Sequence, residues 1–166
     1  SRQDRKIAGM ILEHARGCVL MVNKWDLAEG TVTQRAYGRA LRETVPFLDF
    51  VPVLFLSAAS GFNVRRSIEA IDVVAEQVRT QIATGVLNQV LRRAAERVQP
   101  PVRRGRRLKL FYATQTGVQP VTFTLFVNDP EAATANYQAY LVRALREAFG
   151  FEGAPLRLRF RARRPA

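Results

Sequence analysis

The chain has 166 residues, a length that suits one ordinary domain or two small ones. Hydrophobic residues make up 48% of it, which predicts a packed core and excludes global disorder. The formal net charge is +12. A single cysteine, Cys18, excludes an intramolecular disulfide and a cysteine-rich zinc site. No apolar run approaches the roughly 20 residues of a membrane span, so we expect none. With a single cysteine, a reducing, cytoplasmic setting is the default expectation.

The positive charge is concentrated in the second part of the chain. Residues 1–84 carry 11 Lys and Arg against 9 Asp and Glu, whereas residues 85–166 carry 15 against 5. This asymmetry predicts two parts with different partners, the second a polyanion such as nucleic acid or an anionic membrane. Because 23 of the 26 basic residues are arginine, an Arg-rich codon usage is the alternative explanation.

The first part alternates helices with short apolar strands. We predict helices over residues 4–15, 32–44 and 64 to about 84, with strands at "CVLMVN" and "VPVLFLS" between them. Apolar strands of this kind are buried on both faces in parallel sheets, so the order indicates an α/β layout with right-handed crossovers. The residues expected to face the core are Ile7, Met10, Ile11, Ala15, Ala36, Leu41, Val45, Ile68, Ile71, Val74, Ala75 and Val78.

The second part has a different order of elements. A predicted helix over 86–98, with Val86, Leu87, Val90, Leu91 and Ala94 on one side, leads into a Pro- and Arg-rich connector over 99–107. Two strands, "LKLFYATQ" and "VTFTLFVN", flank a turn and predict an antiparallel pair. A helix from about 131 to 149 and the strand "LRLRFRA" follow. The order α-β-β-α-β predicts a three-stranded sheet with helices on one face and one basic strand face.

Polar clusters follow both strands of the first part. Asn23, Lys24 and Asp26 come after the first strand, and Ser57 and Ala58 end the second. The carboxyl ends of parallel strands are where open α/β sheets bind ligands. N-K-x-D after one strand and S-A after the next is the pattern by which GTP-binding domains recognise guanine. The alternative is that Asn23 and Asp26 only cap a turn.

The residue types fit the chemistry of guanine. The carboxylate of Asp26 could accept both the ring N–H and the exocyclic amino group of the base, a pair of donors that adenine lacks. Asn23 would hold the loop and the base edge, the Lys24 stem would lie along the base and ribose, and the Ala58 N–H would donate to the guanine carbonyl. Trp25 occupies the variable position of the motif and receives no direct ligand role.

The phosphate-binding motifs of GTPases do not occur in the sequence. There is no G-x-x-x-x-G-K-[ST] loop and no D-x-x-G segment, so we expect no catalytic residue, no metal ligand and no GTP hydrolysis from this chain alone. The first residue is Ser, and we expect the chain to be a fragment with further sequence upstream.

These motifs closely resemble the C-terminal portion of the EngA/Der family of bacterial GTPases with two tandem G domains and a KH-like domain. The resemblance rests on "VNKWDL", "VPVLFLSAASGFNV", "QPPVRRGRRLKLFYATQ" and "GFEGAPLRLRF". It implies the end of a P-loop-type G domain over residues 1–82 and an α+β KH-like domain over 85–166. It also implies a role in ribosome assembly, with the large ribosomal subunit, its rRNA and the upstream G domains as partners. The implied GTP/GDP site comprises Asn23, Lys24, Trp25, Asp26, Ser57 and Ala58, with Mg²⁺ bound only in the full-length protein.

Two segments of the KH-like part are candidates for RNA contact. Gly150 to Gly153 matches the G-x-x-G loop of KH domains, but its acidic residue and its place before a strand favour a helix cap and turn. Basic residues are the better candidates, the alternative being a solvated Arg-rich surface. They are Arg103, Arg104, Arg106, Arg107, Arg157, Arg159 and Arg161, with Arg163 and Arg164 beyond.

Two hypotheses therefore stand from the sequence. The first is the C-terminal fragment of a ribosome-assembly GTPase, in which the Cys18–Val22 strand has lost its upstream neighbour and leaves an exposed, covered or rearranged edge. The second is a stand-alone KH-like RNA-binding protein with a vestigial N-K-x-D segment. A small enzyme with other chemistry is disfavoured because no nucleophile–base set or paired carboxylates occur in one loop.

Overall fold

The computed structural model describes residues 2–163, which divide into two compact units. The first unit runs to Val78 and also contains Phe151–Pro155, a segment inside the predicted second domain. The second unit comprises Arg79–Gly150 and the chain from Leu156 onward. The chain therefore crosses between the units three times.

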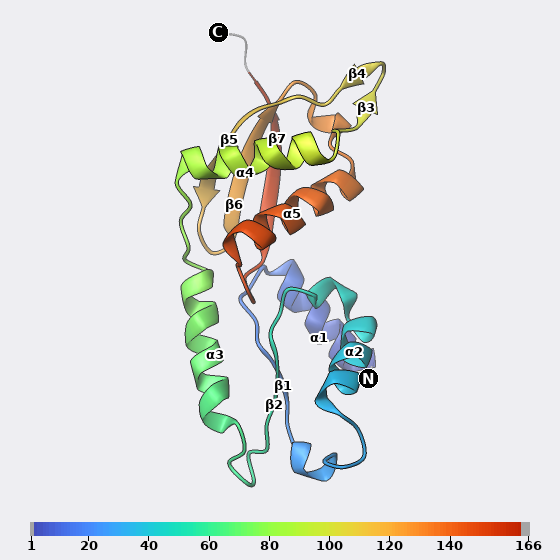
Figure 1. Ribbon diagram of the computed structural model, residues 1–166, viewed down its shortest axis with the longest axis vertical. Coiled ribbons are helices and arrows are strands. Elements are labelled where there is room, and N and C mark those ends of the chain that lie inside the picture. The colour runs from blue at the N-terminus through green and yellow to red at the C-terminus, as the bar shows by residue number, and fades with distance from the viewer. Residues whose placement is uncertain (1, 164–166) are drawn as a thin grey trace. The chain divides into compact units, whose positions relative to one another are not determined.

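The first unit is an α/β arrangement around two parallel strands (Figure 1). Strand β1 (Leu20–Val22) pairs with β2 (Val53–Phe55), with Leu20 opposite Val53 and Val22 opposite Phe55. Helices α1 (Arg2–Glu13) and α2 (Gln34–Thr44) lie on one side of the strands and α3 (Val64–Gln77) on the other. This confirms the predicted order of elements and the parallel pairing.

Several residues predicted to face the core of the first unit are exposed. Its buried cluster consists of Ala8, Val45, Leu48 and Val51, with Leu20 and Leu41 packed against it. A sheet of only two strands is too narrow to cover the apolar faces of the helices beside it, so side chains beyond its edges meet solvent. The predictions were wrong for Ile7, Met10, Ala36, Ile68 and Ile71, and for Val86 in the second unit.

Strand β1 is only partly buried. Met21 at its centre is 41% exposed, and among the described residues β1 pairs only with β2. The prediction of a strand covered on both faces was therefore wrong for Met21. Of the three alternatives for the other edge of β1, exposed, covered or rearranged, the described residues show an edge with no strand beside it.

The second unit confirms the predicted α-β-β-α-β order. Helix α4 (Thr84–Arg97) precedes β5 (Leu110–Gly117) and β6 (Val121–Val127), and helix α5 (Ala135–Phe149) precedes β7 (Leu156–Ala162). The sheet order is β5-β6-β7, with β5 antiparallel and β7 parallel to β6. Residues 99–107, predicted as a Pro- and Arg-rich connector, contain a small hairpin formed by β3 (Val102–Arg103) and β4 (Arg106–Arg107).

The predicted helix over 64–84 ends earlier than expected. Helix α3 stops at Gln77, and residues 80–83 form an irregular connection before α4. The Gln115 side chain holds this connection, because it donates to the Thr80 carbonyl at 2.9 Å and accepts from the Ile82 N–H at 2.8 Å. A contact from a distant strand thus overrides the local helical pattern.

Helices α4 and α5 cover one face of the three-stranded sheet (Figure 1). Strand β6 is central, and the period of two sends alternate side chains to the two faces. The covered face carries Val121, Phe123, Leu125 and Val127, each at most 1% exposed. Buried partners from the helices are Leu87, Leu91, Ala94, Leu141 and Leu145.

Segment 151–155 is built into the first unit by its backbone. Gly153 donates to the Phe50 carbonyl at 2.8 Å and accepts from the Cys18 N–H at 2.9 Å. Phe151 is fully buried and its N–H donates to Gln77 Oε1 at 2.8 Å. Gly150 ends α5 with φ 86°, which confirms the helix cap and turn. A G-x-x-G loop needs accessible backbone, which the burial of this segment denies.

Gly153→Ala should destabilise the protein by about 3 kcal/mol. The position has φ +70°, and an added Cβ would clash with Val74 and would lie 2.7 Å from the Cys18 carbonyl oxygen. Urea unfolding would measure the loss. Gly9→Ala is the matched control, because nothing lies within 4 Å of a Cβ there. Equal stabilities of the two variants would contradict the close approach.

Tyr137 should make the second unit sensitive to alkaline pH. Burial, with a smaller contribution from Tyr140, raises the pKa of Tyr137 to about 12. A tyrosine in the unfolded chain ionises near pH 10, so the free energy of unfolding should fall as the pH rises from about 10 to about 12. Tyr137→Phe should show a smaller fall over this window in urea titrations. Parallel pH profiles for the two proteins would overturn the assignment.

Candidate functional site

The structure brings the two predicted polar loops of the first unit together. The Leu56 N–H donates to the Val22 carbonyl and the Trp25 N–H donates to the Leu56 carbonyl, both at 3.0 Å. Beyond the strands, the Asn23 side-chain oxygen accepts from the Lys24 N–H at 2.8 Å and from the Ala58 N–H at 3.0 Å. Asn23 therefore clamps the N-K-x-D turn to the S-A turn.

Asp26 lies in the short turn that follows this clamp. The turn spans Trp25–Leu27, and Asp26 is exposed there. Among the described residues its carboxylate makes no hydrogen bond or ion pair, so both oxygens can accept from a ligand. Lys24, also exposed, has φ 61°, a left-handed conformation that turns the chain sharply between the clamp and Asp26.

Trp25 has a packing role in the first unit. It is 6% exposed, and its ring lies edge-on to Phe55 with centroids 4.5 Å apart and to Tyr37 at 5.8 Å. Such edge-to-face contacts stabilise aromatic clusters. The buried indole therefore holds the turn to the interior of the unit, while its chain neighbours Lys24 and Asp26 remain exposed.

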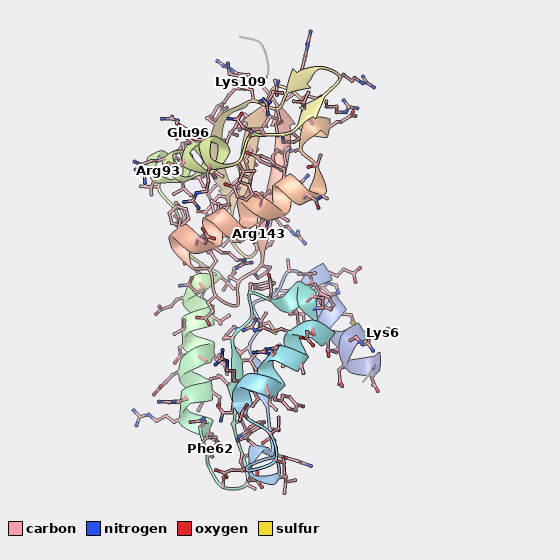
Figure 2. All side chains as sticks on the ribbon, turned by 45° about the vertical axis from the view of Figure 1, so that its right-hand side comes forward. Lys6, Phe62, Arg93, Glu96, Lys109 and Arg143 are labelled. Atoms are coloured by element: carbon pink, nitrogen blue, oxygen red, sulfur yellow. The ribbon has the colours of Figure 1, made fainter. Side chains whose placement is uncertain are left out.

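The S-A turn is held by contacts of Ser57 and Asn63 that the motif spacing does not predict. Ser57 is fully buried and its Oγ accepts from the Ser60 N–H at 3.2 Å. Asn63 donates from its side chain to the Phe55 carbonyl at 3.0 Å and has φ 56°. Asparagine is one of the few residues that adopt this left-handed conformation readily. The sequence "GFN" could therefore have indicated a tight turn at Asn63. Phe62, in the same loop, is exposed (Figure 2).

The hydrogen-bond partner of the Ala58 N–H differs from the one expected. We predicted that it would be available to the guanine carbonyl, but it donates to Asn23 here. A ligand carbonyl at this position would share that donor or replace Asn23 as its acceptor. The clamp thus places the Asn23 oxygen and the Ala58 N–H together at one point of the site.

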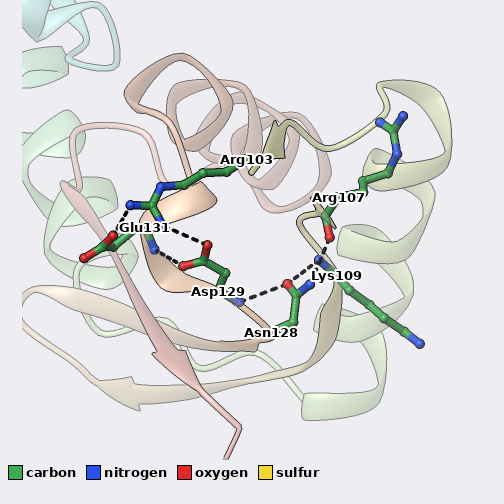
Figure 3. Close-up of polar contacts among 6 residues, drawn as sticks. All are labelled: Arg103, Arg107, Lys109, Asn128, Asp129 and Glu131. Carbon is green, nitrogen blue, oxygen red and sulfur yellow. Dashed lines mark hydrogen bonds and ion pairs between the residues drawn. The ribbon is translucent and has the colours of Figure 1, made fainter. Parts of the chain in front are cut away.

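The arginines predicted to contact RNA lie on two separate elements. The first is the β3–β4 hairpin, where Arg103 pairs with Asp129 at 3.1 Å and with Glu131 (Figure 3). Arg107 donates to the Pro100 carbonyl at 2.7 Å. Arg104 and Arg106 are exposed around the hairpin turn. Arg103 therefore has a structural role, since two carboxylates already neutralise its guanidinium.

Asn128 secures the base of this hairpin (Figure 3). It accepts from the Lys109 N–H at 2.8 Å, donates to the Arg107 carbonyl at 2.9 Å and also accepts from the Asp129 N–H at 2.9 Å. The acidic partners of Arg103 follow directly in the chain. One polar segment thus orders the hairpin without an apolar core of its own.

The second group of arginines lies on β7. Arg157, Arg159 and Arg161 are in register with Thr122, Thr124 and Phe126 of β6, and all three arginines are exposed. They therefore project from the sheet face opposite α4 and α5, as the alternation of "LRLRFRA" predicted. Arg164 lies outside the described residues.

Within residues 2–163 no cluster of three or more His, Cys, Asp or Glu side chains could hold a metal ion. The helices of the same range are all too short or too polar to cross a bilayer.

Comparison with known proteins places the second unit in a family. Residues 81–161 match the family model described as the KH-domain-like, C-terminal domain of EngA bacterial GTPases. Residues 81–161 belong to this family. Over almost the whole chain, the sequence matches GTPases of the EngA/Der family, and the matched KH-like domain is the C-terminal one of that family.

Curated relatives extend the similarity to the first unit. The chain is 45% identical over 159 residues to GTPase Der of Desulfitobacterium hafniense, covering 95% of this chain and 36% of the relative. It is 42% identical over 164 residues to GTPase Der of Desulforamulus reducens, covering 98% and 37%. For GTPase Der of Moorella thermoacetica it is 44% over 162 residues, covering 97% and 37%. The chain spans little more than a third of the length of these EngA/Der relatives.

Two substitutions should separate the clamp from the exposed carboxylate. Asn23→Ala should lower the free energy of unfolding by about 1 kcal/mol, because it removes the acceptor of two backbone N–H groups. Asp26→Asn should change it by less than about 0.5 kcal/mol. Urea unfolding followed by the fluorescence of Trp25, the sole tryptophan, would measure both. A larger loss for Asp26→Asn would refute this division of roles.

Proposed function

We propose that the first unit supplies the guanine-recognition edge of a GTP-binding domain within an EngA/Der-type protein. The carrying observation is that Asn23 ties the two strand-end turns together while the Asp26 carboxylate is left exposed without a described partner. A residue that only capped a turn would use its carboxylate on a nearby N–H. The open acceptor supports a ligand role over a vestigial segment.

The base would be recognised through complementary hydrogen bonds. Asp26 offers two acceptors to the ring N–H and amino group of guanine, and the Ala58 N–H with Asn23 faces the carbonyl edge. Lys24 places its stem along the base and ribose, while Ser57 and Trp25 support the turns from the interior. GTP and GDP are the proposed ligands. We propose that Mg²⁺ and GTP hydrolysis belong to the full-length, cytoplasmic protein.

We propose that the KH-like unit contacts RNA of the large ribosomal subunit and also meets the upstream G domains of the same protein. The support is the charge of residues 85–166 and the exposure of Arg104, Arg106, Arg157, Arg159 and Arg161. Guanidinium groups bind phosphate through paired N–H donors. The function would then be that of the C-terminal module of a ribosome-assembly GTPase.

The nucleotide proposal is tested by titrating the 166-residue chain with nucleosides and nucleotides in a calorimeter. The assigned residues contact the base and ribose and none is assigned to a phosphate, so guanosine, GMP and GDP should bind with affinities within about threefold, and adenosine should not bind. Asp26→Asn should abolish guanosine binding and create xanthosine binding, because xanthine carries a carbonyl where guanine has its amino group.

Glu29→Gln is the matched control, since it removes a carboxylate that is exposed three residues further along the chain. It should bind guanosine as the unaltered chain does. Binding of guanosine by Asp26→Asn at full strength would overturn the role of Asp26. Binding of adenosine as well as guanosine would overturn base recognition altogether.

A further inference from the structure

The sheet of the KH-like unit has one face turned away from helices α4 and α5 (Figure 1). We call it the open sheet face and define it by Tyr112 of β5, Thr124 and Phe126 of β6, and Arg159 and Arg161 of β7. These residues line a broad, shallow hollow of about 870 Å³. The lining also contains Thr116, Pro130, Phe160, Ala162 and Arg163, and no carboxylate is among these described residues.

An aromatic pair lies on this face. Tyr112 stands opposite Phe126 across the antiparallel pair, and their rings are stacked with centroids 4.4 Å apart and planes 14° apart. Phe126 is half-buried, whereas Tyr112 is 45% exposed. The stack fixes the orientation of the Tyr112 ring before any ligand arrives, which lowers the ordering cost of a further stacked ring.

Positive charge lies directly beside the aromatic pair. Arg161 is in register with Phe126, and Arg159 is in register with Thr124, one step further along the same face. Residues two apart on a strand are separated by roughly 6.7 Å, which is comparable with the separation of neighbouring phosphates in an extended nucleic acid strand. Two small side chains, Thr116 and Thr124, occupy the centre of the face, and their hydroxyl oxygens lie 2.8 Å apart.

We propose that the open sheet face binds single-stranded RNA, with an unpaired base stacked on Tyr112 and phosphates held by Arg159 and Arg161. The inference rests on the proposed RNA contact and assigns its recognition mode and surface. An exposed, flat aromatic ring beside guanidinium groups is the arrangement by which proteins bind single strands. In a duplex each base is already stacked on its neighbours, so its faces are not available to Tyr112. An acidic peptide would use the arginines but would leave the stacked pair without a role.

The test is fluorescence anisotropy of a labelled single-stranded oligoadenylate decamer with the 166-residue chain. Tyr112→Ala and Tyr112→Leu should weaken binding about tenfold, and Tyr112→Phe should bind nearly as the unaltered chain does. Two variants guard against a folding defect, and urea unfolding checks each one. Phe62→Ala is the matched control, because Phe62 is also 45% exposed but lies in the first unit.

The arginines are tested through the dependence of binding on salt. Arg159→Gln with Arg161→Gln should lower the slope of log affinity against log salt by about 1.4, the value for two lost phosphate contacts on a single strand. Arg93→Gln with Arg143→Gln changes the net charge equally on helices α4 and α5 (Figure 2) and should leave most of the slope unchanged.

Three results would overturn the inference while the proposed RNA contact stands. They are full-strength binding by both Tyr112 variants, equal binding of an abasic decamer, and tighter binding of a ten-base-pair duplex. Displacement of the RNA by polyglutamate at equal charge concentration would point to an acidic protein partner and would also overturn it. No binding of any RNA by the unaltered chain would refute the proposed RNA contact itself.

Discussion

The backbone of Gly153 is the contact on which the first unit most depends. Its N–H and carbonyl reach Phe50 and Cys18, which lie just before β2 and β1. At the other end of the same strands, Asn23 joins the turns that follow β1 and β2. A parallel pair of only three residues is thus closed at both ends, once by a glycine backbone and once by an amide side chain. The exposed position of Asp26 follows from this closure, because its own carboxylate is not needed to hold the turn.

The KH-like unit obtains its core and its candidate binding face from the same strands. On β6, Phe123 and Leu125 enter the core between sheet and helices, while Thr124 and Phe126 lie on the opposite face in register with the arginines of β7. A shift of register by one residue would exchange these two sets. The requirement to bury Phe123 and Leu125 therefore also fixes where Arg159 and Arg161 project, so packing energy positions groups that contribute nothing to packing.

Local sequence patterns predicted the features that depend on the spacing of apolar residues along a strand or on the position of a motif after a strand. The alternation of "LRLRFRA" predicted the basic face, and the strand ends predicted that the N-K-x-D and S-A turns lie at the same edge of the sheet. Features that depend on distant partners were not predictable. Ile68 and Ile71 have the spacing of a buried face, but their exposure depends on the width of the sheet beside them. Arg103 is typical of a phosphate ligand in sequence, and only the fold places Asp129 and Glu131 against it.

The proposed binding of a base would be linked to the stability of the first unit. A base held at Asn23, Asp26 and Ala58 would bind only the folded arrangement, in which both turns are in place, and would stabilise it by RT ln(1 + [L]/Kd). The strands stabilised in this way are the ones that Gly153 joins at their opposite end. Segment 151–155 also continues directly into β7, the strand that carries Arg157, Arg159 and Arg161. The chain therefore passes from the segment that Gly153 holds in the first unit directly into the strand that carries these arginines.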